Sequence, residues 1–165
     1  MTTEMEIFIK LLGLAKCLKG FELDDLRSLL SISSKATWDK GETVFIEGDR
    51  GRDMFIICSG KVSIWRRNGS GNVSLASLAE GESFGEMGLV RGCERSAGAT
   101  AVEPTVALRI SYERLHQAPS AAAALYKNIA KELAERLKIA DDIIVFQSQS
   151  GAEHPPLMTI GRYAR

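Results

Sequence analysis

The chain has 165 residues, of which 45% are hydrophobic, and Lys plus Arg balance Asp plus Glu at 21 each. A chain of this length buries about 70% of the surface that its unfolded form exposes, which predicts one self-standing core with appendages. The balanced charge excludes a general attraction to nucleic acid or to an anionic membrane, so any anion site must be local.

The cysteines and the N-terminus define the expected compartment. Cys17, Cys58 and Cys93 are widely spaced and form no CxxC pair, so we interpret them as reduced thiols and not as metal ligands. No apolar run approaches the roughly 20 residues that cross a bilayer, and the start MTTEMEIF is acidic where a signal peptide is basic. We therefore expect a soluble, cytoplasmic protein with no membrane partner.

Residues 5–31 carry apolar side chains at helical spacing. Gly20 interrupts the pattern, which predicts two N-terminal helices. The apolar positions are Ile7, Leu11, Leu14, Leu23, Leu26, Leu29 and Leu30.

Residues 34–111 form short runs that are separated by glycines and are rich in β-branched and aromatic side chains. Many short strands with frequent turns predict a β-sandwich or barrel. Asn68 and Gly69 stand between two alternating runs, a strong hairpin signal that makes residues 61–78 antiparallel. The runs are TVFI, MFIICS, KVSIWRR, VSLASL, RSAGATAV and TVALRI.

Residues 112–147 return to a helical pattern. Pro119 stands where a first helical turn accepts proline, and no breaker follows for about 25 residues, which predicts one helix of about 37 Å. A heptad seam on this helix can dock on the chain's own β-domain or on a second copy in a homodimer. We expect residues 148–165 to form a tail. The seam residues are Tyr126, Ala130, Leu133, Leu137, Ala140 and Ile144.

The stretch FGEMGLVRGCERSAGATA places Glu86 and Arg95 in a run of small and apolar residues. Gly85 opens a single helical turn whose free backbone N–H groups attract an anion. Arg95 offers a planar fork that matches two phosphate oxygens, and Ser96 adds a hydroxyl. Glu86 would repel a phosphate unless it accepted a hydrogen bond from a sugar hydroxyl. Together these residues predict a nucleotide site.

The segment FGEMGLVRGCERSA resembles the phosphate-binding cassette of cyclic nucleotide-binding domains, the module of catabolite activator protein and of protein kinase A regulatory subunits. The upstream GETVFIEGDRGRDMFIICSGKVSI is similar to the strand framework of that family. The resemblance covers residues 23–144 and implies a mainly β fold, an antiparallel, jelly-roll-like β-roll flanked by N-terminal helices and a long C-terminal helix. The framework positions are Gly41, Gly48, Asp49, Phe55, Ile57 and Gly60.

The resemblance also implies a ligand and its contacts. Glu86 resembles the acceptor of the ribose 2'-hydroxyl, and Arg95 resembles the clamp on the cyclic phosphate. Ser96 favours cAMP over cGMP, although its hydroxyl can also serve guanine. The implied ligand-binding residues are Phe84, Gly85, Glu86, Met87, Gly88, Arg95, Ser96 and Ala97.

We therefore expect a cyclic nucleotide sensor, not an enzyme, that repositions its C-terminal helix for an unknown protein effector. His116 and His154 are lone histidines, so no metal is expected, and residues 148–165 are too few for a winged helix-turn-helix that would bind DNA. Gly98 and Ala99, small where relatives carry larger residues, predict a looser strand beside the ligand.

Three alternatives remain open. The protein can be a structural dimerisation module with a vestigial pocket, in which the helical seam carries the function. Glu86 and Arg95 can form a structural ion pair with no ligand. An enzyme on a related double-stranded β-helix scaffold is the third reading, and the missing metal-binding histidines argue against it.

Overall fold

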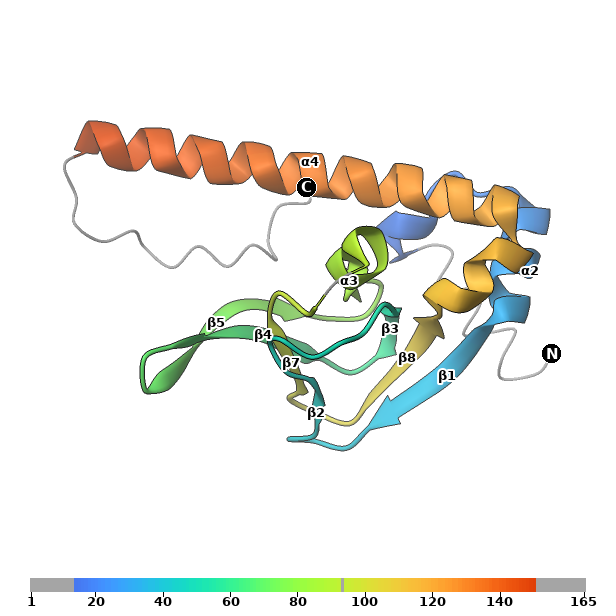
Figure 1. The fold of residues 1–165 in the computed structure, drawn as a ribbon, viewed down its shortest axis with the longest axis horizontal. Helices are drawn as coiled ribbons and strands as arrows, with labels where there is room; N and C mark the ends of the chain where they lie inside the picture. Colours follow the sequence, from blue (N-terminus) through green and yellow to red (C-terminus); the bar gives the residue numbers. More distant parts are fainter. Residues whose placement is uncertain (1–13, 93, 151–165) are drawn as a thin grey trace.

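The computed structural model describes residues 14–92 and 94–150, with the side chains of residues 149 and 150 excepted. Helices flank a strand-rich body, and one long helix runs across it (Figure 1). The elements are η1 (Lys16–Leu18), α2 (Leu23–Ile32), β1 (Ser33–Trp38), β2 (Thr43–Phe45), β3 (Met54–Ser59), β4 (Val62–Asn68), β5 (Gly71–Leu78), β6 (Ser83–Phe84), α3 (Glu86–Arg91), β7 (Gly98–Ala101), β8 (Thr105–Ile110), η2 (Tyr112–Gln117) and α4 (Pro119–Ser150).

The strands form two four-stranded sheets, ordered β1-β8-β3-β6 and β2-β7-β4-β5, in which every pairing is antiparallel. Aromatic side chains join the sheets: Phe45 of β2 lies 6.4 Å from Phe55 of β3, which stacks on Phe84 of β6 at 5.1 Å between ring centroids. Offset or tilted rings at these distances stabilise a core beyond the area they bury. The predicted antiparallel β-roll with flanking helices is confirmed.

The hairpin of β4 and β5 confirms the predicted antiparallel region. Asn68 pairs with Gly71, so the turn consists of Gly69 and Ser70, one residue later than predicted. Gly69 has a φ of 58°, the left-handed conformation that such two-residue turns require.

A second core lies outside the roll, where η1, α2, η2 and the first half of α4 pack against β3 and β8. Ala121, Leu125 and Ile129 are the α4 residues that this core buries completely. Asn128 donates two hydrogen bonds of 2.9 Å, to the carbonyls of Cys17 and Lys19, which fix α4 to η1. The first half of α4 is thereby held by apolar packing and by hydrogen bonds.

The predicted helix boundaries agree in part with the described elements. α4 begins at Pro119, as predicted, and continues to Ser150, past the expected end at residue 147. The predicted first helix falls mainly on residues 1–13, and most of the predicted tail falls on residues 151–165. Both lie outside the described residues.

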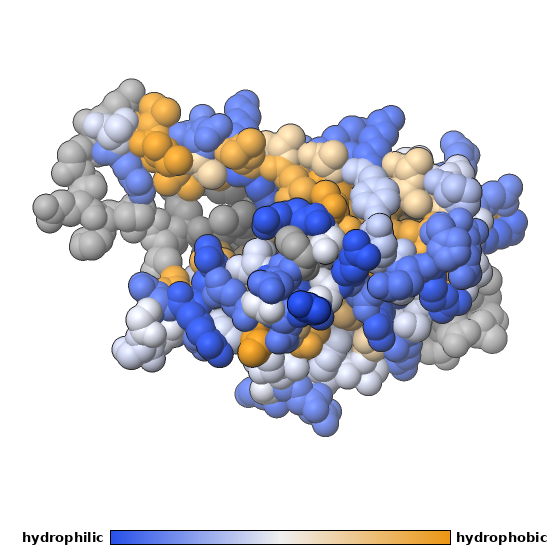
Figure 2. Space-filling view, viewed as in Figure 1, coloured by the Kyte–Doolittle hydropathy of each residue, from blue (hydrophilic) through white to orange (hydrophobic). Residues whose placement is uncertain are grey.

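The predicted heptad seam of α4 meets the body of the protein only along its first half, where Tyr126 and Leu133 pack against the helical core. In that seam Leu137 and Ile144 are 63% and 62% exposed. Apolar side chains are visible along α4 in the space-filling view (Figure 2). The docked stripe is offset by one residue and consists of Leu125, Ile129, Glu132, Arg136 and Ile139.

Gly98 is required by the packing of a neighbouring indole. A Cβ on Gly98 would lie 2.4 Å from ring carbons of Trp65, whose Nε1 donates a 3.0 Å hydrogen bond to Thr100 Oγ1. Ala99 beside it is completely buried. The expectation of a loose strand is therefore wrong, because the Trp65 ring occupies the space that a larger side chain would fill.

We predict that Gly98→Ala lowers the free energy of unfolding by about 1–3 kcal/mol, because the added methyl group overpacks against Trp65. Urea unfolding followed by far-UV circular dichroism measures the change. Gly71→Ala is the matched control, since a Cβ there meets nothing within 4 Å. Equal unfolding free energies for the two variants would contradict this packing.

Candidate functional site

A cavity of about 450 Å³ lies between the hairpin of β4 and β5, the short helix α3 and the middle of α4. Its volume falls within the range that small-molecule ligands occupy. All eight residues that the sequence predicted for ligand binding line this cavity. Their gathering in one place is a feature of the fold, while their contact with a ligand remains a prediction.

Gly85 opens α3 at one end of the cavity. It caps the helix with φ 80° and ψ 3°, a left-handed conformation that favours glycine. A Cβ at this position would also lie 2.9 Å from Arg95 Nη1 and from the carbonyl oxygen of Asp53. The chain therefore turns here at close range to Arg95.

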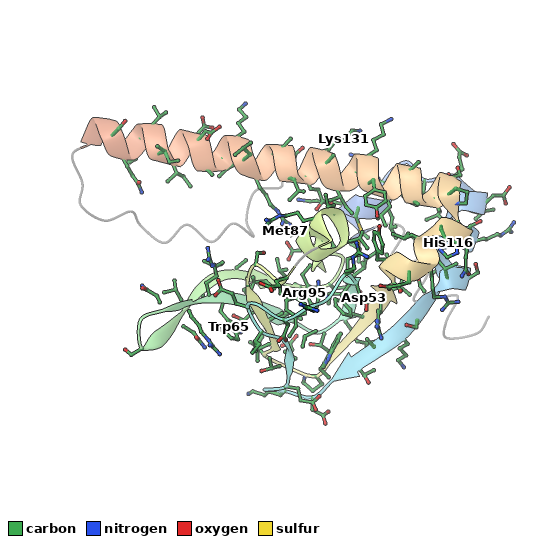
Figure 3. The ribbon with its side chains drawn as sticks, in the orientation of Figure 1. Asp53, Trp65, Met87, Arg95, His116 and Lys131 are labelled. Carbon is green, nitrogen blue, oxygen red and sulfur yellow. The ribbon has the colours of Figure 1, made fainter. Side chains whose placement is uncertain are left out.

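Arg95 is buried beneath α3, with Asp53 nearby (Figure 3). Its Nη1 donates a 3.0 Å hydrogen bond to the Gly85 carbonyl, and its guanidinium carbon lies 4.2 Å from the centroid of the Phe45 ring. Gly51 and Gly88 complete the surroundings, because a Cβ on either would come within 2.9 Å of a guanidinium nitrogen. A side chain at either position would occupy the space of the guanidinium. We call this glycine-lined space around Arg95 the cradle.

The Arg95 cation is only partly compensated. Burial lowers its pKa, and the carboxylates of Asp53, Asp49 and Glu86 act in the opposite direction. Asp53 itself forms an ion pair of 2.5 Å with Arg109. The Nε of Arg95 is buried without a hydrogen-bond partner among the described residues. Arginine keeps its proton at physiological pH, so Arg95 is a buried cation that the described residues compensate only in part.

Glu86, in the first turn of α3, is only 6% exposed. Its Oε1 accepts a 2.5 Å hydrogen bond from Nη1 of Arg136 on α4. The buried carboxylate is therefore paired across the cavity with α4. The alternative in which Glu86 forms a structural ion pair with Arg95 does not match this geometry.

Glu132 lies one turn before Arg136 and also lines the cavity. Its Oε2 is 4.0 Å from Arg136 Nη2, and its Oε1 is buried without a hydrogen-bond partner among the described residues. Burial raises the pKa of Glu132 above the ordinary value of 4.5, Arg136 lowers it and Glu86 raises it further. The cavity wall on α4 thus combines charged side chains with the apolar Ile139.

Three residues that line the cavity, Arg136, Glu132 and Phe45, were not among the predicted site residues. The sequence does contain a signal for Glu132 and Arg136. Leu125 and Ile129 begin an apolar stripe at helical spacings of three and four, and these two charged residues occupy its next positions. Charged residues on the docked face of a helix must meet polar partners. Phe45 belonged to a predicted strand, but nothing in the run TVFI indicates a cation above its ring.

The remaining predicted residues line the rest of the cavity. Phe84 is buried in the roll core, and Gly88 lies against Arg95. Ser96 Oγ contacts the sulfur of Met87 at 3.3 Å, and Ala97 lines the cavity beside Ser96. Ser96 thus brings a hydroxyl to the cavity wall.

Two further findings concern metals and membranes. Within residues 14–92 and 94–150, no three His, Cys, Asp or Glu side chains are grouped as metal ligands would be. His116 is exposed, and His154 lies outside the described residues. No helix in the described part of the chain has the length and apolar character needed to span a bilayer.

Comparison with known proteins places this geometry in a family. The cyclic nucleotide-binding domain model matches residues 35–120. The cyclic AMP receptor protein of Thermus thermophilus is 34% identical over 132 residues, covering 78% of this chain and 61% of the relative. Glutaminase 2 of Bradyrhizobium diazoefficiens is 32% identical over 136 residues, covering 79% of this chain and 21% of the enzyme. The chain therefore spans about three fifths of one relative and one fifth of the other.

A solved structure agrees with the sequence relationship. The crystal structure of Thermus thermophilus catabolite activator protein superposes with a TM-score of 0.74 at 32% identity, over 81% of this chain and 63% of that one. The family model covers more than half of the chain, and its match includes both Glu86 and Arg95. The chain belongs to the cyclic nucleotide-binding domain family.

Proposed function

We propose that this protein is a sensor that binds a cyclic nucleotide, cAMP in preference to cGMP, and signals through the position of α4. The observation that carries the proposal is the buried guanidinium of Arg95, whose Nε lacks a partner among the described residues. It faces the same cavity as Glu86, so a cation and a carboxylate are available to one ligand.

The phosphate belongs at Arg95. A guanidinium presents donors in a fixed plane and binds two oxygens of a phosphate at once, which suits the unpaired Nε. The turn at Gly85 adds the backbone N–H groups of Glu86 and Met87, and Ser96 adds a hydroxyl. An anion bound here supplies the compensation that the buried Arg95 cation otherwise lacks.

The ribose belongs at Glu86. A carboxylate in a phosphate site is unfavourable unless it serves a different group, and it accepts a hydrogen bond well from a hydroxyl. A 3',5'-cyclic nucleotide has one free ribose hydroxyl, at the 2' position. Glu86 is therefore assigned to that hydroxyl.

The base belongs against the apolar part of the cavity. Its lining there includes Ile64, Leu75, Ala76, Met87 and Ile139, side chains suited to the faces of a purine. The preference for cAMP is supported by Ser96 and by a relative at 34% identity whose name is cyclic AMP receptor protein.

The signal passes from α3 to α4. Leu89 anchors α3 in the core with no exposed surface, whereas Met87 and Val90 are exposed. A ligand that draws the Gly85 turn toward Arg95 also moves α3. Because Glu86 of α3 is paired with Arg136 of α4, this movement reaches α4. Ligand shifts the position of α4 only as far as its affinity differs between the two arrangements. The output is a surface on or under α4 for a protein effector.

The sensor performs no catalysis of its own and uses no metal. We assign it to the cytoplasm, a reducing compartment that suits the free thiols of Cys17 and Cys58. Relatives such as the glutaminase are far longer than the matched region, so catalysis there is assigned to the remaining parts of the chain.

A second copy of this chain is the partner that the outer face of α4 fits best. Leu137 and Ile144 are more than 60% exposed, and they belong to one heptad seam with Ala140. A seam at this spacing pairs two helices of the same sequence by knobs-into-holes packing. We propose a homodimer through α4, and dimerisation alone, with a vestigial pocket, is the rival function.

We expect Arg95→Ala to weaken cAMP binding by about 30-fold to several thousand-fold, because removing one member of a buried charged contact costs about 2–5 kcal/mol. Isothermal titration of the nucleotide-stripped protein measures the dissociation constant. Arg95→Lys keeps the charge without the fork and should lie between the wild type and Arg95→Ala. A loss below fivefold for Arg95→Ala would show that Arg95 does not clamp the phosphate.

For the dimer, we predict that Leu137→Glu with Ile144→Glu makes the protein monomeric, because two charges replace the apolar contacts of the seam. Sedimentation equilibrium gives the mass, and Lys131→Glu, on the exposed side of α4, is the control that leaves it unchanged. A wild-type protein that is monomeric at high concentration would contradict the dimer. A dimer without nucleotide binding would favour the rival function.

A further inference from the structure

The β-roll has a second cavity, of about 540 Å³, at the edges of its two sheets. One sheet ends at β1 and the other at β2, on the side of the roll away from α4 (Figure 1). We call this space the rear cavity; it is lined by residues of β1, β2 and β3, by the loop that leads into β3, and by Arg95 and Arg109. Its volume suits a small-molecule ligand, and the mouth of a β-barrel is a common place for one.

Aromatic side chains form the apolar wall of the rear cavity. Trp38, Phe45 and Phe55 all line it, and Trp38 meets Phe55 edge-on at 5.4 Å between ring centroids. Phe55 is buried, whereas Trp38 and Phe45 are only half-buried. Half-buried rings can stack with a further planar group at centroid distances of about 4.5–7 Å. The wall therefore favours a planar, aromatic occupant.

The charged groups of the rear cavity carry one positive charge in excess, because three arginines and two aspartates line it. These residues are Arg50, Arg95, Arg109, Asp49 and Asp53. Asp53 is paired with Arg109, whose Nε donates a 2.7 Å hydrogen bond to Asp53 Oδ2. Asp49 Oδ2 accepts a 2.9 Å hydrogen bond from a backbone N–H. Both carboxylates thus already have partners, and the cavity favours an occupant with one negative charge.

Arg95 presents its unpaired edge to the rear cavity. A Cβ on Gly51, which lines this cavity, would lie 2.8 Å from Nε and 2.9 Å from Nη2 of Arg95. Cβ atoms on Gly85 and Gly88 would instead meet Nη1, so Nη1 points to α3. Nε is buried without a hydrogen-bond partner among the described residues, and the whole of Arg95 is only 6% exposed. The edge formed by Nε and Nη2 is a planar pair of donors that matches a carboxylate.

We propose that the rear cavity binds a small aromatic carboxylate, whose ring stacks on Trp38 and whose carboxylate pairs with the Nε edge of Arg95. Arg95 and Phe45 line both cavities, so the two occupants share one cation. The site itself is independent of the proposed function, but its effect on the nucleotide rests on that function. Because the phosphate also uses Nε, the aromatic carboxylate and the cyclic nucleotide weaken each other's binding, by the same factor in both directions.

The site is tested by titrating the isotopically labelled protein with benzoate and following it by NMR. The chain has two tryptophans: Trp38 lines the rear cavity and Trp65 lines neither cavity, so their indole N–H signals form a reporter and an internal control. Trp38→Phe identifies the reporter signal by removing it. We expect saturable shifts of the Trp38 signal with a dissociation constant of about 1 mM or tighter, and an unchanged Trp65 signal. Benzamide, which has the same ring without the charge, should bind about tenfold more weakly.

Arg50→Glu separates the rear cavity from the nucleotide cavity. Arg50 is exposed and lines only the rear cavity, so the variant should fold, bind benzoate about three- to tenfold more weakly, and bind cAMP alone within about twofold of the wild type. Lys40→Glu is the matched control, because Lys40 is exposed on the turn between β1 and β2 and lines neither cavity. It changes the net charge equally and should leave the benzoate affinity within about twofold of the wild type.

Saturating benzoate should raise the apparent dissociation constant for cAMP by about fivefold or more, relative to sodium chloride at the same ionic strength. An unmoved Trp38 signal, equal binding of benzamide, or equal effects of Arg50→Glu and Lys40→Glu would overturn the rear site. An unchanged cAMP constant in saturating benzoate would overturn the sharing of Arg95. A wild type that binds benzoate beside Trp38 but binds no cAMP would overturn the proposed function and leave the rear site in place.

Discussion

The burial of one permanent cation, the guanidinium of Arg95, is the constraint on which the site depends. A guanidinium does not lose its proton at physiological pH, so the fold must compensate it. Gly51 and Gly88 leave room for it, Phe45 lies beneath its plane, and the Gly85 carbonyl accepts one donor. Its buried Nε finds no acceptor among the described residues. The fold therefore keeps a buried cation with one donor that no described residue satisfies.

The two cores place Arg95 and the middle of α4 on the same cavity. The roll core of Phe55 and Phe84 fixes the strand that leads into α3, and the helical core fixes the start of α4. Between them the ion pair of Glu86 with Arg136 joins α3 to α4 across the cavity. This ionic contact thus lies between the two apolar cores.

Local sequence patterns predicted the strands and the turn at Gly85. Contacts between residues far apart in the chain could not be predicted in this way. The runs MFIICS and TVALRI became β3 and β8 with the predicted bounds, because central strands buried on one or both faces are continuously apolar or alternate clearly. β1 showed no such pattern, since it lies at a sheet edge and none of its side chains is fully buried. The pairing of Arg136 with Glu86 and of Gly98 with Trp65 joins residues 33 or more positions apart, which no local pattern encodes. α4 carries two stripes at the same helical spacing, one that begins at Leu125 and one that begins at Tyr126. The sequence alone does not show which of them is buried more deeply.

The most direct test of the account is a calorimetric titration of the wild-type, nucleotide-stripped protein with cAMP, followed by competition with cGMP. The account predicts saturable one-site binding at micromolar affinity or tighter, about 8 kcal/mol or more, with weaker competition by cGMP. No heat and no competition at high protein concentration would contradict it. The buried Arg95 would then be an element of the fold alone, and the function would pass to the exposed seam of α4.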